Sequence, residues 1–146
     1  PTDNYTTWIT ENGLAALAID KQALDADPDN DGLANLLEYA LGKDPVAVDA
    51  LGITPDTSSG SLSITFVRVK ASIDASLTYK VELATTLSDW AEANVTLTGA
   101  LQGVDQAGLP DGNDFATSKY ERVKATATTD IAGSSGKQFL RMTVEK

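Results

Sequence analysis

The residues best suited to chemistry in this chain lie in one twelve-residue stretch, DPDNDGLANLLE, at 27–38. Asp27, Asp29 and Asp31 occupy its first, third and fifth positions, and Glu38 occupies the twelfth. Calcium takes about six to eight oxygen ligands, and loops with this spacing supply them from carboxylates, a backbone carbonyl and a bidentate glutamate. The glycine at the sixth position permits the sharp turn that brings these ligands around an ion. The stretch therefore predicts a Ca²⁺ site.

Two residues between the glycine and the glutamate complete the expected shell. Leu33 would contribute its backbone carbonyl oxygen, and Asn35 would bind directly or through a water. The predicted metal ligands are Asp27, Asp29, Asp31, Leu33, Asn35 and Glu38. Magnesium fits this set less well, because it demands octahedral geometry and usually keeps several of its waters.

The alternative is a solvated acidic turn that binds nothing, since Asp, Asn and Gly are common turn residues. A turn, however, does not require a glutamate after an apolar helical stretch. Three carboxylates within five residues, at 27–31, also repel one another unless a cation lies among them. Calcium binding is therefore the better interpretation.

The charge of the chain is concentrated around this loop. The 146 residues carry a formal net charge of −10. Residues 1–56 hold 11 acidic and 2 basic side chains, whereas residues 57–146 hold 10 and 9. This excess of negative charge opposes nucleic-acid phosphates and anionic membrane surfaces, so we expect neither as a partner.

The chain contains no cysteine and no histidine. Disulfides, thiolate nucleophiles, histidine-based catalytic triads and ordinary structural zinc sites are therefore excluded. We expect no enzymatic activity. No apolar run approaches the roughly 18–20 residues that span a bilayer, so we expect no membrane insertion. The first residues resemble no signal peptide, and we expect a processed product or a module of a longer protein.

The spacing of apolar residues changes from helical to alternating along the chain, so we expect two subdomains, at 1–56 and 57–146. Apolar residues at helical spacing predict helices at 3–12, 14–24 and 33–41, with Trp8 buried on the first. A connector rich in Pro, Asp, Gly and Ser follows at 43–61. Alternating apolar and polar residues then predict strands at 62–69, 77–84, 95–97, 119–128 and 140–144. This pattern predicts a mainly β fold: an antiparallel β-sandwich of immunoglobulin or fibronectin III type, with an N-terminal helical unit carrying an EF-hand-like calcium loop.

The segment DPDNDGLANLLEYALGKDP at 27–45 resembles the DPDGDGLxNLLEYALGxDP segment near the C-termini of large secreted bacterial proteins. It is also akin to thrombospondin type 3 and dockerin calcium loops. LTYKVE at 77–82, LSDW at 87–90 and FLRMTV at 139–144 are similar to further parts of the same module. The resemblance implies a calcium-stabilised accessory module and no defined activity. A dockerin would need a second such loop, which residues 44–56 do not supply.

A second acidic cluster lies at Asp105–Asp114. Its Asp-Gly and Gly-Leu-Pro sequences are typical of a hairpin loop, with a weaker calcium site as the alternative. Aromatic residues raise a different possibility, because exposed rings can stack on sugars. A coplanar exposed pair among Trp90, Phe115, Tyr120 and Phe139 would indicate a carbohydrate-binding module of a secreted polysaccharide-degrading enzyme.

The leading interpretation is a non-enzymatic, calcium-stabilised structural or attachment module of a larger protein. We expect it to be secreted, extracellular or on a bacterial cell surface, where calcium keeps such a loop filled. Expected partners are other domains of the parent protein, or a cell-surface or polysaccharide ligand. We expect the module itself to be a monomer.

Overall fold

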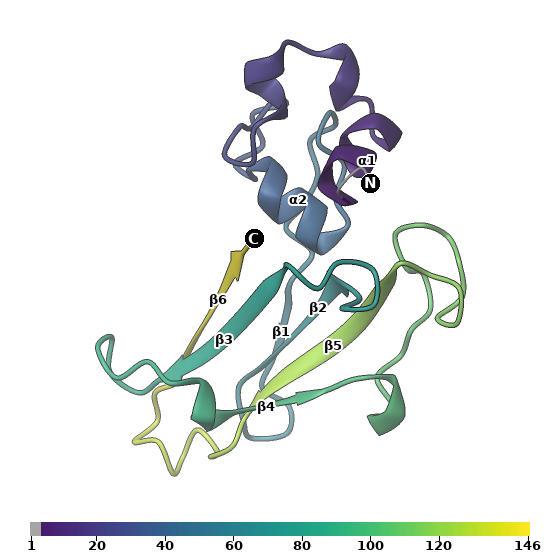
Figure 1. Cartoon of the computed structure of the whole chain (residues 1–146). Helices are drawn as coiled ribbons and strands as arrows, with labels where there is room; N and C mark the ends of the chain where they lie inside the picture. Colours follow the sequence, from purple (N-terminus) through teal and green to yellow (C-terminus); the bar gives the residue numbers. More distant parts are fainter. Residues whose placement is uncertain (1–3) are drawn as a thin grey trace.

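The computed structural model describes residues 4–146. The first element of the described residues is α1 (Asn4–Glu11), close to the expected helix at 3–12, of which residue 3 lies outside the described residues. Two 3₁₀ turns, η1 (Leu14–Ala16) and η2 (Ile19–Gln22), lead to the loop at 27–34 and to α2 (Asn35–Leu41). Figure 1 shows these helices together at one end of the strands.

Two of the helix predictions need correction. The helix expected at 14–24 is wrong: η1 and η2 are separate turns, because Leu17 between them has extended backbone angles (φ −90°, ψ 166°). The helix expected from residue 33 begins at Asn35, since Ala34 is also extended (φ −72°, ψ 151°). The helix ends as expected at Gly42, whose φ of 67° lies in the left-handed region that favours glycine.

The remaining chain forms two antiparallel sheets. The first has the order β1-β2-β5-β4, and the second pairs β3 with β6. The strands are β1 (Thr54–Asp56), β2 (Ser63–Val69), β3 (Thr78–Ala84), β4 (Val95–Thr98), β5 (Tyr120–Ala127) and β6 (Phe139–Glu145). The five expected strands are all present, and β1 is an additional strand within the expected connector at 43–61. Two further 3₁₀ turns, η3 (Glu92–Asn94) and η4 (Ala100–Gln102), flank β4.

Two apolar clusters hold these parts together. One lies between the sheets, where Phe66 of β2 and Val123 of β5 are register partners and share a cluster with Val81 of β3. The other lies under the helices and combines Trp8 of α1 with Tyr39 of α2 and with sheet residues. Trp8 is 4% exposed, as its helical spacing predicted. The helix α2 contributes to both clusters and so connects them.

The fold is mainly β with antiparallel sheets and two α-helices, which confirms the coarse prediction. The immunoglobulin or fibronectin III type of the sandwich stays a prediction. The expected ranges 1–56 and 57–146 are in contact, since β1 pairs with β2. Among residues 4–146, no helix has the length and apolarity needed to cross a membrane.

Candidate metal centre

The loop at 27–38 is fixed at its two ends by backbone and amide hydrogen bonds. The Asn35 N–H donates to the Ala26 carbonyl at 2.8 Å, which closes the base of the loop. The Asn35 side-chain amide donates to the carbonyls of Lys21 (2.9 Å) and Ala23 (2.8 Å). Asn35 is fully buried. One role of this residue is therefore to attach the start of α2 to the end of η2.

Inside the loop, each aspartate accepts a backbone N–H from further along the chain. Asp27 Oδ2 accepts from Gly32 at 3.0 Å, and Asp29 Oδ1 accepts from Asp31 at 3.1 Å. Asp31 Oδ1 accepts from Leu33 at 2.8 Å. The φ of Gly32 is 95°, which allows the chain to reverse at that point. These bonds orient the three carboxylates and leave further oxygens for a ligand.

The three carboxylates converge. Ligand oxygens of Asp27, Asp29 and Asp31 all lie within 4.8 Å of one another, so the cluster could hold a metal ion. Three of the six predicted ligands therefore lie together, and their role as calcium ligands stays a prediction. Burial raises the pKa of Asp29 although Asp31 donates a backbone hydrogen bond to it. Asp29 is thus a carboxylate short of compensating positive charge.

Glu38 carries the most unusual side chain of the site. It lies in α2, is fully buried, and neither carboxylate oxygen has a hydrogen-bond partner among the described residues. Burial and the neighbouring aspartates raise the pKa of Glu38 to about 8. A buried carboxylate without a partner carries a large free-energy cost, which a bound cation would offset. Glu38 lies outside the cluster whose oxygens are all within 4.8 Å of one another, so it would close the metal shell from the side of α2.

The other two predicted ligands occupy suitable places in the loop. Asn35 Oδ1 is buried and lacks a hydrogen-bond partner among the described residues. The carbonyl oxygen of Leu33 accepts no hydrogen bond from them either. Both oxygens remain available for coordination, and their roles as ligands stay predictions.

The structure adds Asp49, which the loop pattern does not contain. Its backbone N–H donates to Asp31 Oδ2 at 3.0 Å, which ties the connector after α2 to the aspartate cluster. Asp49 Oδ1 is buried without a hydrogen-bond partner in the described chain, and its charge contributes to the raised pKa of Glu38. Lys43 Nζ lies 3.7 Å from this oxygen. Sequence spacing gave no signal for Asp49.

The positions of the buried oxygens without hydrogen-bond partners indicate whether the loop suits a metal ion. Among residues 4–146, every buried side-chain oxygen without a hydrogen-bond partner belongs to this loop or to Asp49. These oxygens are Asp27 Oδ1, Asp29 Oδ2, Asn35 Oδ1, Glu38 Oε1 and Oε2, and Asp49 Oδ1. Buried polar groups in native proteins are almost always satisfied, and an ion is one of the usual reasons when they are not. The donor set fits a hard, oxygen-preferring cation.

The second acidic stretch, Asp105–Asp114, has a different structure. Asp111 accepts hydrogen bonds from Ser118 Oγ and from the Lys119 N–H, both at 2.8 Å. Its neighbours likewise accept turn N–H groups. No second carboxylate cluster of metal-binding geometry occurs within residues 4–146. The loop therefore uses its acids to fix turns, in agreement with the leading prediction for it.

The aromatic residues proposed for sugar stacking do not form a pair. Tyr120 is 9% exposed. The Trp90 ring is covered by the Arg141 guanidinium at 4.4 Å, and the Phe115 ring by Lys70 Nζ at 4.4 Å. The ring–ring contacts in the described chain all lie in the buried group of Tyr5, Trp8 and Tyr39. The coplanar exposed pair that would favour this alternative is not found among these residues.

Comparisons with known proteins leave the site to be interpreted from its own geometry. No family model matches the chain, and no curated protein and no solved structure is significantly similar to it. The resemblance to bacterial calcium modules therefore rests on its sequence motifs alone.

Proposed function

We propose that this chain is a non-enzymatic module whose fold is stabilised by one Ca²⁺ ion bound in the loop at 27–38. We further propose that it serves a larger secreted or cell-surface protein as a structural or attachment domain. The observation that carries the proposal is the fully buried carboxylate of Glu38, with neither oxygen partnered in the described chain. Asp27, Asp29 and Asp31 would supply the other carboxylates, with Asp49 as a candidate beyond the loop.

Calcium is the cation that this set favours. The available ligands are all oxygens, and the chain has no cysteine or histidine to prefer a softer metal. Six buried oxygens and one backbone carbonyl match the coordination number of calcium and exceed what magnesium usually takes from protein.

The ion would act by tying three segments together. Its ligands come from the loop, from α2 through Glu38, and from the connector through Asp49. The same helix places Tyr39 and Leu41 in the two core clusters, so holding the helix also holds the junction between helices and sheets. At a calcium concentration about 100 times Kd, binding adds about 2.7 kcal/mol to the stability of the folded state. That is a large part of the net stability of a domain this size.

A structural role suits an extracellular module without disulfides. The chain has no cysteine, and extracellular calcium is abundant enough to fill a site of even modest affinity. The ion would then perform the cross-linking that disulfides perform in other secreted domains.

Thermal unfolding of chelator-treated protein tests the proposal. We expect millimolar calcium to raise the Tm by several degrees relative to excess EDTA, and magnesium at the same concentration to raise it much less. Equal Tm values in calcium and EDTA, on a sample shown by elemental analysis to be metal-free, would contradict it.

A further inference from the structure

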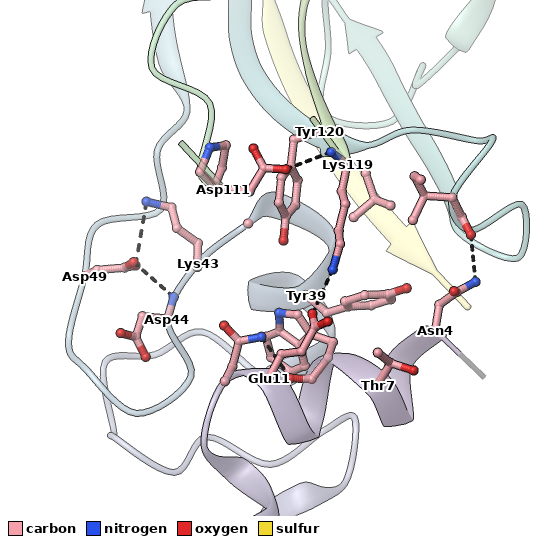
Figure 2. Close-up of a pocket in the computed structure, with 16 residues that line it drawn as sticks. Asn4, Thr7, Glu11, Tyr39, Lys43, Asp44, Asp49, Asp111, Lys119 and Tyr120 are labelled. Carbon is pink, nitrogen blue, oxygen red and sulfur yellow. Dashed lines mark hydrogen bonds and ion pairs between the residues drawn. The ribbon is translucent and has the colours of Figure 1, made fainter. Parts of the chain in front are cut away.

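A cleft of about 420 Å³ lies between α1 and the adjoining ends of the sheet strands (Figure 2). Residues of α1 form one wall, and the start of β5 with the preceding loop forms the other. The end of α2 and the following connector close a third side. Its volume falls in the range of small-molecule binding sites.

The cleft combines aromatic walls with polar groups. The rings of Trp8, Tyr39 and Tyr120 line it, together with carboxylates, amides and two lysines. In Figure 2 the Lys119 side chain crosses toward Glu11, and the two form an ion pair at 2.8 Å. Both side chains are about half exposed, so this pair contributes little to stability and can exchange partners readily.

Two side chains that line the cleft, Trp8 and Tyr120, keep a hydrogen-bonding group without a partner among residues 4–146. Apart from the oxygens of the metal centre, the single buried unpartnered side-chain atom among residues 4–146 is Trp8 Nε1. The Tyr120 hydroxyl also makes no hydrogen bond with the described residues, and Figure 2 shows it directed into the cleft. Burial raises the pKa of Tyr120 to about 12, so the hydroxyl keeps its proton and can donate. An unpartnered hydroxyl donor directed into a cavity of this size indicates a ligand with acceptor oxygens.

The charged side chains that line the cleft indicate which class of ligand it can bind. Apart from Asp49, which we assign to the metal, three carboxylates line the cleft against two lysines: Glu11, Asp44 and Asp111 against Lys43 and Lys119. The excess of carboxylates disfavours phosphates and other anions. A neutral ligand that both donates and accepts hydrogen bonds, and that has an apolar face for the rings, suits the cleft best. Sugars have these properties.

We propose that this cleft binds a short neutral saccharide. Tyr120 Oη and the lysine ammonium groups would donate to its ring and hydroxyl oxygens, while Glu11 and Asp111 would accept from its hydroxyls. The site is separate from the aromatic side chains of Trp90, Phe115 and Phe139. It also goes beyond the calcium-stabilised role, because its ligand contacts do not include the metal.

Titration of ¹⁵N-labelled full chain tests this directly, with cellobiose, maltose, lactose and mannobiose as separate probes in saturating calcium. We expect at least one of them to give saturable shifts at the amides of Gly42, Lys119 and Tyr120. Tyr120→Phe removes the hydroxyl and keeps the ring, so we expect it to weaken binding by about 3- to 10-fold. Trp90→Phe, outside the cleft, is the matched control and should leave binding unchanged.

Three results would overturn the proposal. These are no saturable shift with any of the four sugars, equal affinity in wild type and Tyr120→Phe, or loss of binding in Trp90→Phe. Glucuronate, titrated in the same way, would overturn the assignment to a neutral ligand if it bound more tightly than all four neutral sugars. An unchanged Tm of each variant in calcium shows that the fold is intact, so failure here remains distinguishable from failure of the calcium proposal.

Discussion

Replacing Glu38 by glutamine should remove the increase in Tm that calcium gives, but it should not lower the stability of the protein in EDTA. The substitution keeps the shape of the side chain and removes the charge and bidentate ligation that would close the metal shell. For a chain of 146 residues, a calcium contribution of about 2.7 kcal/mol corresponds to a Tm increase of about 9 °C. We expect wild type to show an increase of this size at about 100 times Kd and Glu38→Gln to show almost none.

In EDTA the same substitution should not destabilise the protein. Burial and the surrounding aspartates raise the pKa of Glu38 to about 8, so the metal-free folded state holds this carboxyl protonated at pH 7. Protonating a carboxyl of ordinary pKa at pH 7 costs about 3 kcal/mol, which glutamine avoids. Some of that gain is offset, because the buried amide of the glutamine also needs partners.

Differential scanning calorimetry of wild type, Glu38→Gln and the exposed control Glu92→Gln, each in calcium and in EDTA, measures both effects. The control changes the same chemical group outside the site and should behave as wild type. The reasoning is refuted if calcium raises the Tm of Glu38→Gln as much as that of wild type. It is also refuted if Glu38→Gln is much less stable than wild type in EDTA.

Three further substitutions test other parts of the account. Asp49→Asn should weaken calcium binding by about 10-fold in isothermal titration calorimetry, because it removes a charge beside Asp31; unchanged affinity would limit Asp49 to holding the connector. Gly42→Ala should cost about 1–3 kcal/mol in urea unfolding, since its φ is 67° and an added Cβ would lie 2.5 Å from Pro110 Cγ. Gly60→Ala, with φ 87° and nothing within 4 Å, is the matched control and should cost less. Burial alone would raise the pKa of Asp74, but hydrogen bonds from its neighbours hold it well below its usual range. Its contribution is therefore present above pH about 4 and lost at lower pH, so Asp74→Asn should be destabilised at pH 7 and approach wild type as the pH falls below 4 in acid-unfolding curves.

The metal loop could be predicted because its information is local. Asp27, Asp29 and Asp31 are separated by single residues, and the turn that gathers them depends on the glycine among them. Their convergence therefore follows from short-range geometry. Asp49 lies eleven residues after Glu38 and reaches the cluster through a connector without regular spacing. Nothing in the sequence specifies that path.

Secondary structure, too, could be predicted where the sequence pattern is long and local, and not where distant pairing decides it. Strands such as β2 and β5 alternate over seven or eight residues, which is long enough for a period of two to be visible. The strand β1 has three residues, one of them Pro55, and is set by pairing with β2 and not by any pattern of its own. The prediction of a helix at 14–24 was wrong because apolar residues are frequent there, whereas the extended backbone of Leu17 interrupts the helix.

The cleft was beyond prediction from sequence. Helical spacing correctly placed Trp8 in the core. The wall opposite it is formed by Tyr120 and the loop before β5, more than a hundred residues later in the chain. Only the docking of α1 against the sheet ends creates the space between them, and docking geometry depends on the whole fold.

The binding stoichiometry of calcium tests the central claim most directly. Chelator-treated wild type should be titrated with calcium in an isothermal titration calorimeter, with Glu38→Gln and a magnesium titration as references. The account predicts saturable binding of one calcium ion per chain, strongly weakened in Glu38→Gln and not reproduced by magnesium at the same concentration. No saturable calcium binding to folded wild-type protein would contradict it.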